Sequence, residues 1–159
     1  MHPIRRILVP IDFSPHSHVA LQYATDLAHH YHASLELVHV LDIGIYSLGD
    51  GSPMLDPVQF ENIVNQITHD LDEAKRDALA AGVGVVRTKL LQGKPNRELL
   101  RIALEDAVDL IVMGTHGRTG FRHLLMGSVA ELLVRRASCP VFTVKSTAAN
   151  ESLSQTSEA

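Results

Sequence analysis

Short apolar segments alternate along the chain with longer segments of helical periodicity. Five apolar runs are predicted to be strands, at 7–11, 35–41, 83–91, 109–113 and 141–144. The first of these, Ile7–Ile11, is a continuous apolar run, which is typical of a strand that is buried on both faces of a parallel sheet. The pattern therefore predicts five strands separated by helices.

Four segments between these runs carry helix signals. Ser14-Pro15 and Asp56-Pro57 place a capping residue directly before a proline, and Gln59 completes a capping box in the second case. The second helix is expected to end near Ala81. A third helix is expected to begin at Pro95, and a fourth is expected over 128–137. The stripes predicted to face the core are Val19, Tyr23, Leu27 and Tyr31 with Ala20, Ala24 and Ala28, then Phe60, Ile63, Ile67, Leu71, Ala74 and Ala78, then Leu99, Ile102, Ala103 and Ala107.

The alternation predicts the fold class. A strand-helix repeat of this kind indicates a single α/β domain, an open five-stranded parallel sheet with helices on both faces. The domain is expected over 1–145, and the polar, aperiodic segment 146–159 is expected to be a disordered tail. Ligands of such sheets bind beyond the carboxyl ends of the strands, where the strand order reverses.

Composition narrows the function. The chain has 159 residues, which is the length of one ordinary domain. It carries 14 Lys and Arg against 18 Asp and Glu, and this acidic balance argues against binding to nucleic acid. Its one cysteine, Cys139, excludes an intrachain disulfide framework. No signal peptide and no apolar run of about 18 residues is found, so we expect a cytoplasmic protein without membrane attachment.

A glycine-bearing segment follows the fourth predicted strand. Gly114 and Gly117 lie at the strand end, and Gly127-Ser128 lie where the last helix begins. Glycine lets backbone amides approach an anion, and a helix N-terminus offers unpaired N–H groups. Ser128 can add a hydroxyl donor, and Arg118 can add positive charge. We interpret the segment as a phosphate site; the alternative is that the glycines only form turns and Ser128 only caps a helix.

Two common nucleotide signatures are missing. The chain has no G-x-x-x-x-G-K-[ST] sequence, and the turn from Pro10 to His18 contains no glycine, so it holds no G-x-G-x-x-G fingerprint. These absences argue against a P-loop NTPase and a Rossmann dehydrogenase.

The spacing G-x2-G-x9-G-[ST] resembles the nucleotide motif of the universal stress protein family, in its ATP-binding branch. The segments Ile7–Asp12, Asp109–Gly114, Gly127–Glu131 and Ser138–Val141 are similar to the family as well. The resemblance implies the strand order 3-2-1-4-5, and it implies homodimers joined through the last strand, Val141–Val144. It also implies an ATP site formed by Pro10, Asp12, Val40, Met113, Gly114, Gly117, Gly127, Ser128 and Val129.

The function expected from this resemblance is that of an ATP-binding, nucleotide-dependent regulator of stress responses. Mg²⁺ or Mn²⁺ would accompany the phosphates, because the loop has no lysine to neutralise them. The alternatives are a slow ATPase or self-phosphorylating enzyme on the same fold, or an interaction module without nucleotide. A protein partner would be needed for regulation, and the sequence does not identify it.

Other candidate residues have ordinary explanations. Asp12 could instead help Ser14 to cap the first helix. His29, His30 and His32 suit a solvated helix end better than a metal site, and His116 could act as acid or base or only contact solvent. We assign no catalytic residue and no metal ligand. Cys139 is expected to be a small buried apolar residue. The loop 42–55 is hypothesised to be a lid over the nucleotide, the alternative being an insertion.

Overall fold

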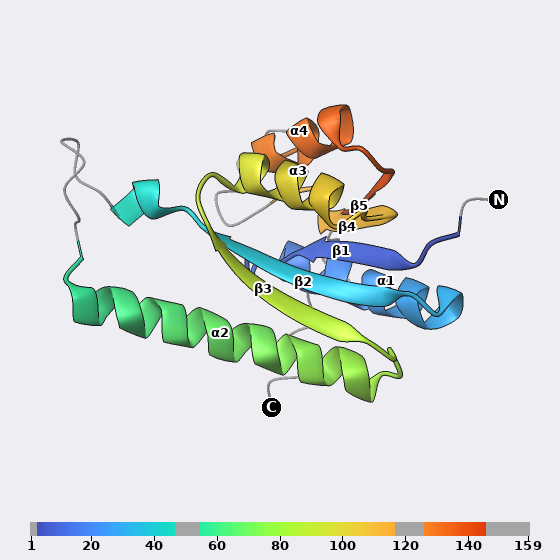
Figure 1. The fold of residues 1–159 in the computed structure, drawn as a ribbon, viewed down its shortest axis with the longest axis horizontal. Coiled ribbons are helices and arrows are strands. Elements are labelled where there is room, and N and C mark those ends of the chain that lie inside the picture. Colours follow the sequence, from blue (N-terminus) through green and yellow to red (C-terminus); the bar gives the residue numbers. More distant parts are fainter. Residues whose placement is uncertain (1–2, 47–54, 117–125, 146–159) are drawn as a thin grey trace.

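The computed structural model describes residues 3–46, 55–116 and 126–145. The chain forms a five-stranded parallel sheet with the order β3-β2-β1-β4-β5, which confirms the expected fold class and strand order (Figure 1). The strands are β1 (Arg6–Pro10), β2 (Ser34–Leu41), β3 (Val86–Gln92), β4 (Leu110–Gly114) and β5 (Val141–Val144). The order reverses between β1 and β4, so β1 lies at the centre of the sheet.

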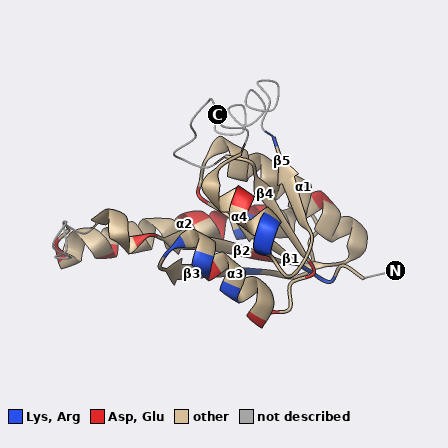
Figure 2. Ribbon diagram, turned by 90° about the horizontal axis from the view of Figure 1, so that it is seen from above, with Lys and Arg blue, Asp and Glu red and all other residues tan. Residues whose placement is uncertain are grey.

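Helices cover both faces of the sheet. One core lies beneath α1 (Pro15–Tyr31) and α2 (Pro57–Ala80), and a second core lies beneath α3 (Pro95–Glu105) and α4 (Ser128–Arg136). Figure 1 shows the two helix pairs on opposite sides of the strands. Lys and Arg are interspersed with Asp and Glu over these helices (Figure 2).

The strand sequences explain this three-layer arrangement. Ile7 and Val9 of β1 point into the core under α1 and α2, whereas Leu8 points into the other core, and all three are fully buried. All five residues of β4 are buried as well. Because successive side chains of a strand alternate between faces, only an unbroken apolar run can fill both cores.

The stripe predicted for α1 is partly wrong. Tyr23 and Tyr31 are 44% and 48% exposed, while Ala20, Ala24 and Ala28 are almost fully buried. The small alanine side chains let the helix axis approach the sheet closely. The tyrosines, which lie to one side of that narrow contact, therefore remain at the surface.

Two predicted boundaries also need correction. β3 begins at Val86 instead of Val83; Val83 is buried, but it follows a turn in which Gly82 has a φ of 96°. α3 ends at Glu105, and Ala107 is exposed with a φ of 48°. In both places an apolar residue belongs to a turn that closes a helix, so periodicity alone assigned it to the neighbouring element.

The helix starts follow the predicted chemistry. Ser14 Oγ accepts a hydrogen bond from Ser17 N, and Asp56 and Gln59 form the complete capping box. The segment predicted as loop 42–55 begins with a 3-10 turn at Ile43–Tyr46. Residues 47–54 lie outside the described residues, so the lid remains a hypothesis, as does the disorder predicted for 146–159.

Gly114 closes the contact between α1 and the end of β4. A Cβ atom at this position would lie 2.8 Å from His16 Cβ and 3.0 Å from the His16 carbonyl carbon and oxygen. We expect Gly114→Ala to lower the free energy of unfolding by about 1–3 kcal/mol, as overpacking in a core does. Urea denaturation measures this change.

Gly84 provides the matched control, because a Cβ there meets nothing within 4 Å. The free energy of unfolding of Gly84→Ala should lie within about 0.5 kcal/mol of the wild-type value, or slightly above it. A Gly114→Ala variant as stable as Gly84→Ala would contradict the tight contact with His16.

Candidate functional site

A cleft of about 870 Å³ opens at the carboxyl ends of the central strands. Its lining includes Asp12 and Phe13 after β1, Val40 of β2 and Thr115 after β4. Helix α2 forms one wall through Ile63 and Ile67, and the start of α4 forms another. The cleft thus lies at the topological switch point, where doubly wound sheets bind their ligands.

Most of the predicted site residues meet in this cleft. Eight of them line it: Pro10, Asp12, Val40, Met113, Gly114, Gly127, Ser128 and Val129. The other two, Gly117 and Arg118, lie outside the described residues. Segments from three strands and one helix are therefore brought together as the sequence analysis expected; that they bind a nucleotide stays a prediction.

The start of α4 presents backbone donors to the cleft. Gly127 is the N-cap, and α4 has no side-chain cap among the described residues. Gly127 N donates to the Thr115 carbonyl at 2.7 Å, which ties the helix start to the end of β4. Ser128, Val129 and Ala130 follow in the first turn and line the cleft. First-turn amides have no partner within their own helix, so they and the helix dipole favour an anion here.

Asp12 has the capping role considered for it, and its contact with a nucleotide stays a prediction. Its Oδ1 accepts hydrogen bonds from Ser14 N at 3.0 Å and Ser14 Oγ at 2.6 Å, so it supports the cap of α1. It also lines the cleft. The capping bonds hold the carboxylate at the mouth of the switch point in a defined position.

Phe13 and His39 were missed by sequence reasoning. Phe13 has a φ of 61°, and its ring stacks on His39 with 5.1 Å between ring centroids. His39 is buried, and its Nδ1 lies 2.7 Å from the Ile11 carbonyl oxygen, which can only accept. His39 is the one polar residue within the apolar run 37–41, which is the only signal in the sequence. Nothing in the sequence indicates the backbone conformation of Phe13.

The charges of the lining are acidic. Among the described residues that line the cleft there are three carboxylates, Asp12, Asp42 and Asp70, and neither lysine nor arginine. Asp42 forms an ion pair with Lys94 at 3.1 Å. His116 also lines the cleft, and its ring lies 5.6 Å from the ring of His16. Within this part of the chain, an anion would be held by backbone amides and dipoles instead of by fixed cations.

Cys139 is not part of the cleft lining, and it is half-buried instead of fully buried as the sequence analysis expected. Burial raises the pKa of its thiol, and the negative charge of Asp109 raises it further, which outweighs a hydrogen bond involving Ile111. A raised pKa keeps the thiol protonated and weakens it as a nucleophile.

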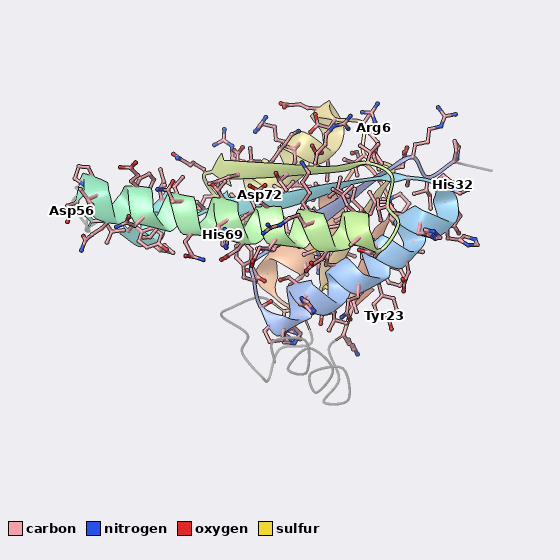
Figure 3. All side chains as sticks on the ribbon, turned by 90° about the horizontal axis from the view of Figure 1, so that it is seen from below. Arg6, Tyr23, His32, Asp56, His69 and Asp72 are labelled. Carbon is pink, nitrogen blue, oxygen red and sulfur yellow. The ribbon has the colours of Figure 1, made fainter. Side chains whose placement is uncertain are left out.

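One group of potential metal ligands was not foreseen. His69, Asp70 and Glu73 of α2 place ligand atoms within 4.8 Å of one another. Figure 3 shows His69 along the outer side of the helix. The side chains of His69 and Glu73 are 61% and 57% exposed, and such groups gather on helix surfaces without a metal, so we assign no ion here.

The fold and the cleft define an open, doubly wound α/β protein with a ligand-sized cleft at its switch point. The model of the universal stress protein family matches residues 3–145. The chain belongs to this family, as its motif spacing indicated.

Three relatives illustrate the relationship. Universal stress protein MJ0531 of Methanocaldococcus jannaschii is 32% identical over 145 residues, which covers 89% of this chain and 82% of that protein. The structure of UspA from Lactobacillus plantarum has a TM-score of 0.78 at 25% identity and covers 91% of this chain and 99% of that chain. The structure of a universal stress protein in complex with cAMP has a TM-score of 0.70 at 25% identity, and the match covers 92% of this chain and 100% of that chain.

In the ranges 3–46, 55–116 and 126–145, no helix combines the length and the apolar character that crossing a membrane requires.

The positive φ of Phe13 generates a stability prediction. A left-handed backbone costs an L-residue about 1–2 kcal/mol, and glycine avoids this cost. Phe13→Gly and Phe13→Ala both remove the ring that stacks on His39, but only the alanine variant keeps the strain. We expect Phe13→Gly to be more stable than Phe13→Ala by about 1 kcal/mol in urea denaturation.

The same pair of substitutions at Tyr23 is the control. Tyr23 is 44% exposed and lies within α1, where alanine is about 1 kcal/mol more favourable than glycine. The order of the two variants should therefore be reversed at Tyr23. The same order at both positions would contradict a left-handed Phe13.

Proposed function

We propose that this universal stress protein binds ATP in the cleft at the switch point and acts as a nucleotide-dependent regulator in the cytoplasm. The observation that carries the proposal is the start of α4. There, first-turn backbone amides without a side-chain cap face a cleft of about 870 Å³, among the described residues. Most of the residues that the family resemblance assigned to ATP line the same cleft.

The chemistry of the cleft suits the two ends of a nucleotide. Pro10, Val40 and Met113 offer an apolar surface for adenosine near the strand ends. Gly127, Ser128 and Val129 offer the helix N-terminus for the phosphates. The relative in complex with cAMP shows that a family member of similar fold binds an adenine nucleotide. The uncapped start of α4 and the apolar lining at the strand ends would suit the phosphates and the base of ATP, and both support the proposal.

A divalent ion would accompany the triphosphate. Among the described residues, the lining carries Asp12, Asp42 and Asp70 and no lysine or arginine, so these side chains would repel a bare triphosphate. Mg²⁺ or Mn²⁺ binds phosphate oxygens directly and removes most of this repulsion. We therefore expect tighter ATP binding with the ion than in chelator.

Regulation requires that binding change something outside the cleft. ATP would bridge the turn after β1 and the start of α4, which belong to opposite helix layers. A ligand that binds one arrangement of these two segments better than another shifts their equilibrium. A protein partner that contacts this edge of the sheet would then sense the nucleotide.

Slow ATP hydrolysis or self-phosphorylation is the second candidate. His116 lines the cleft near α4, with Nδ1 3.0 Å from Thr115 Oγ1, and is placed to move a proton. We rank it second because the segment 114–127 contains no lysine that could stabilise a phosphate group during its transfer. Phosphate release from ATP that is absent in His116→Gln, with ATP affinity unchanged, would favour the enzyme.

Substitution of Ser128 tests the role of the backbone amide. Proline at the first position of a helix is favourable, and Gly127 already has the extended backbone, with φ −71° and ψ 154°, that a following proline requires. Ser128→Pro therefore removes one amide donor without breaking α4. A hydrogen bond to a charged group contributes about 1.5–3 kcal/mol, so calorimetry with Mg-ATP should show roughly 10- to 150-fold weaker binding.

Ser128→Ala separates the hydroxyl from the amide. This variant keeps the N–H and should bind Mg-ATP more tightly than Ser128→Pro does. Wild-type protein that takes up no ATP, ADP, AMP or cyclic AMP at millimolar concentration would refute the proposed function. Equal affinities of Ser128→Pro and wild type would refute the role of α4.

We further propose a homodimer joined through β5. This strand is the last in the sheet order, and within the described ranges it pairs with β4 alone, so its outer edge could pair with a strand of a second copy. Phe142 of β5 is 42% exposed and lies against Tyr23 of α1, with 6.1 Å between ring centroids. Val134 of α4 is 50% exposed. Exposed apolar side chains on three elements near one sheet edge support an interface between copies.

Replacement of Phe142 tests this interface. Phe142→Lys places a charge at the strand edge and should shift the protein from dimer to monomer in sedimentation velocity at micromolar concentration. Val58→Lys is the matched control, because Val58 is 66% exposed on α2, away from β5, and this variant should stay dimeric. A monomeric wild type, or a dimer that survives Phe142→Lys, would contradict the proposal.

A further inference from the structure

The backbone of Phe13 is unusual for its residue type. Its φ of 61° lies in the left-handed region, which bulky side chains seldom occupy. Such strain persists only where the surrounding structure holds it, and it is concentrated at functional sites. Phe13 lies in the turn between β1 and α1 and lines the cleft.

Several contacts hold this turn in place. Ile11 N donates to the Val38 carbonyl at 2.8 Å, and His39 donates to the Ile11 carbonyl at 2.7 Å. On the other side of Phe13, Ser14 N and Oγ donate to Asp12. The turn is therefore fixed to β2 before Phe13 and to the cap of α1 after it.

The ring of Phe13 is supported on one side by His39, and the residue lines the cleft. It stacks on the buried ring of His39, with an interplanar angle of 27°. Phe13 is nevertheless 39% exposed. A phenylalanine that served only to fill the core would be buried, whereas this one is a rigid aromatic surface presented to the space where a ligand fits.

We propose that Phe13 stacks against the purine ring of the bound nucleotide and that His39 supports it as a positioning residue. This inference rests on the proposed function and deepens it, since it names the side chain that would contact the base. An aromatic ring that is preset by its backbone loses little freedom on binding. Stacking acts on the π-face and gives affinity for the base independently of the phosphates.

Calorimetry with Mg-ATP tests the inference. Phe13→Gly removes the ring and is compatible with the left-handed backbone, so the turn should remain folded. We expect roughly 5- to 150-fold weaker binding, the range that loss of base stacking produces. Phe13→Tyr keeps the ring and should bind within a few-fold of wild type. His39→Leu should weaken binding less than Phe13→Gly, because it removes only the support.

Fluorescence gives a second, direct readout. The chain has no tryptophan, so Phe13→Trp introduces a single indole at the cleft. Stacking of the purine should quench it on titration with Mg-ATP. Tyr31→Trp is the control. Tyr31 is 48% exposed at the end of α1, just before β2 begins, so it lies at the amino ends of the strands, away from the cleft. The indole of this variant should not respond to Mg-ATP.

The outcomes are distinguishable from those of the proposed function. If wild type binds no nucleotide, the proposed function fails and this inference fails with it. If wild type binds Mg-ATP and Phe13→Gly binds equally well, only the stacking role is overturned. An unquenched Phe13→Trp variant that calorimetry shows to bind Mg-ATP would overturn it as well.

Discussion

The burial of β1 and β4 side by side is the constraint on which the rest of this structure depends. Both strands are covered on both faces, and their chains leave the sheet toward opposite helix layers. Neighbouring chain ends that diverge in this way leave a space between them that the core side chains do not fill. The cleft is thus a consequence of the strand order. The residues after β1 and β4 line it because these two segments leave the sheet on either side of the space.

The two sides of the cleft are fixed by different kinds of contact. After β4, Gly114 lets the backbone of His16 approach closely, so α1 packs directly on the strand end. After β1, hydrogen bonds from His39 and to Asp12 hold a strained turn. One side depends on the absence of a side chain and the other on well-placed polar groups. A ligand held between them would meet preformed surfaces, which lowers the ordering cost of binding.

The structure separates a packing role from an anion-binding role within the glycine motif. Gly114 was interpreted as part of a phosphate site, but its contact with His16 is a sufficient packing reason for glycine at that position. The anion-binding character rests instead on the first turn of α4, where no side chain caps the helix among the described residues. Backbone donors carry no titratable charge. Any change with pH in their attraction for a phosphate therefore comes from the phosphate, whereas a histidine would add a change of its own.

Sequence alone determined the elements and the family. Apolar runs and capping residues such as Asp56 and Gln59 are local signals, and their physical effect does not depend on the rest of the fold. The family resemblance that the motif around Gly127 carries likewise named eight of the residues that line the cleft. Tertiary structure decided which apolar residues are buried, since Tyr23 and Tyr31 follow the helical period but lie beside the contact with the sheet. It also decided the left-handed Phe13 on His39, because residues far apart in the chain impose that conformation and no local pattern encodes it.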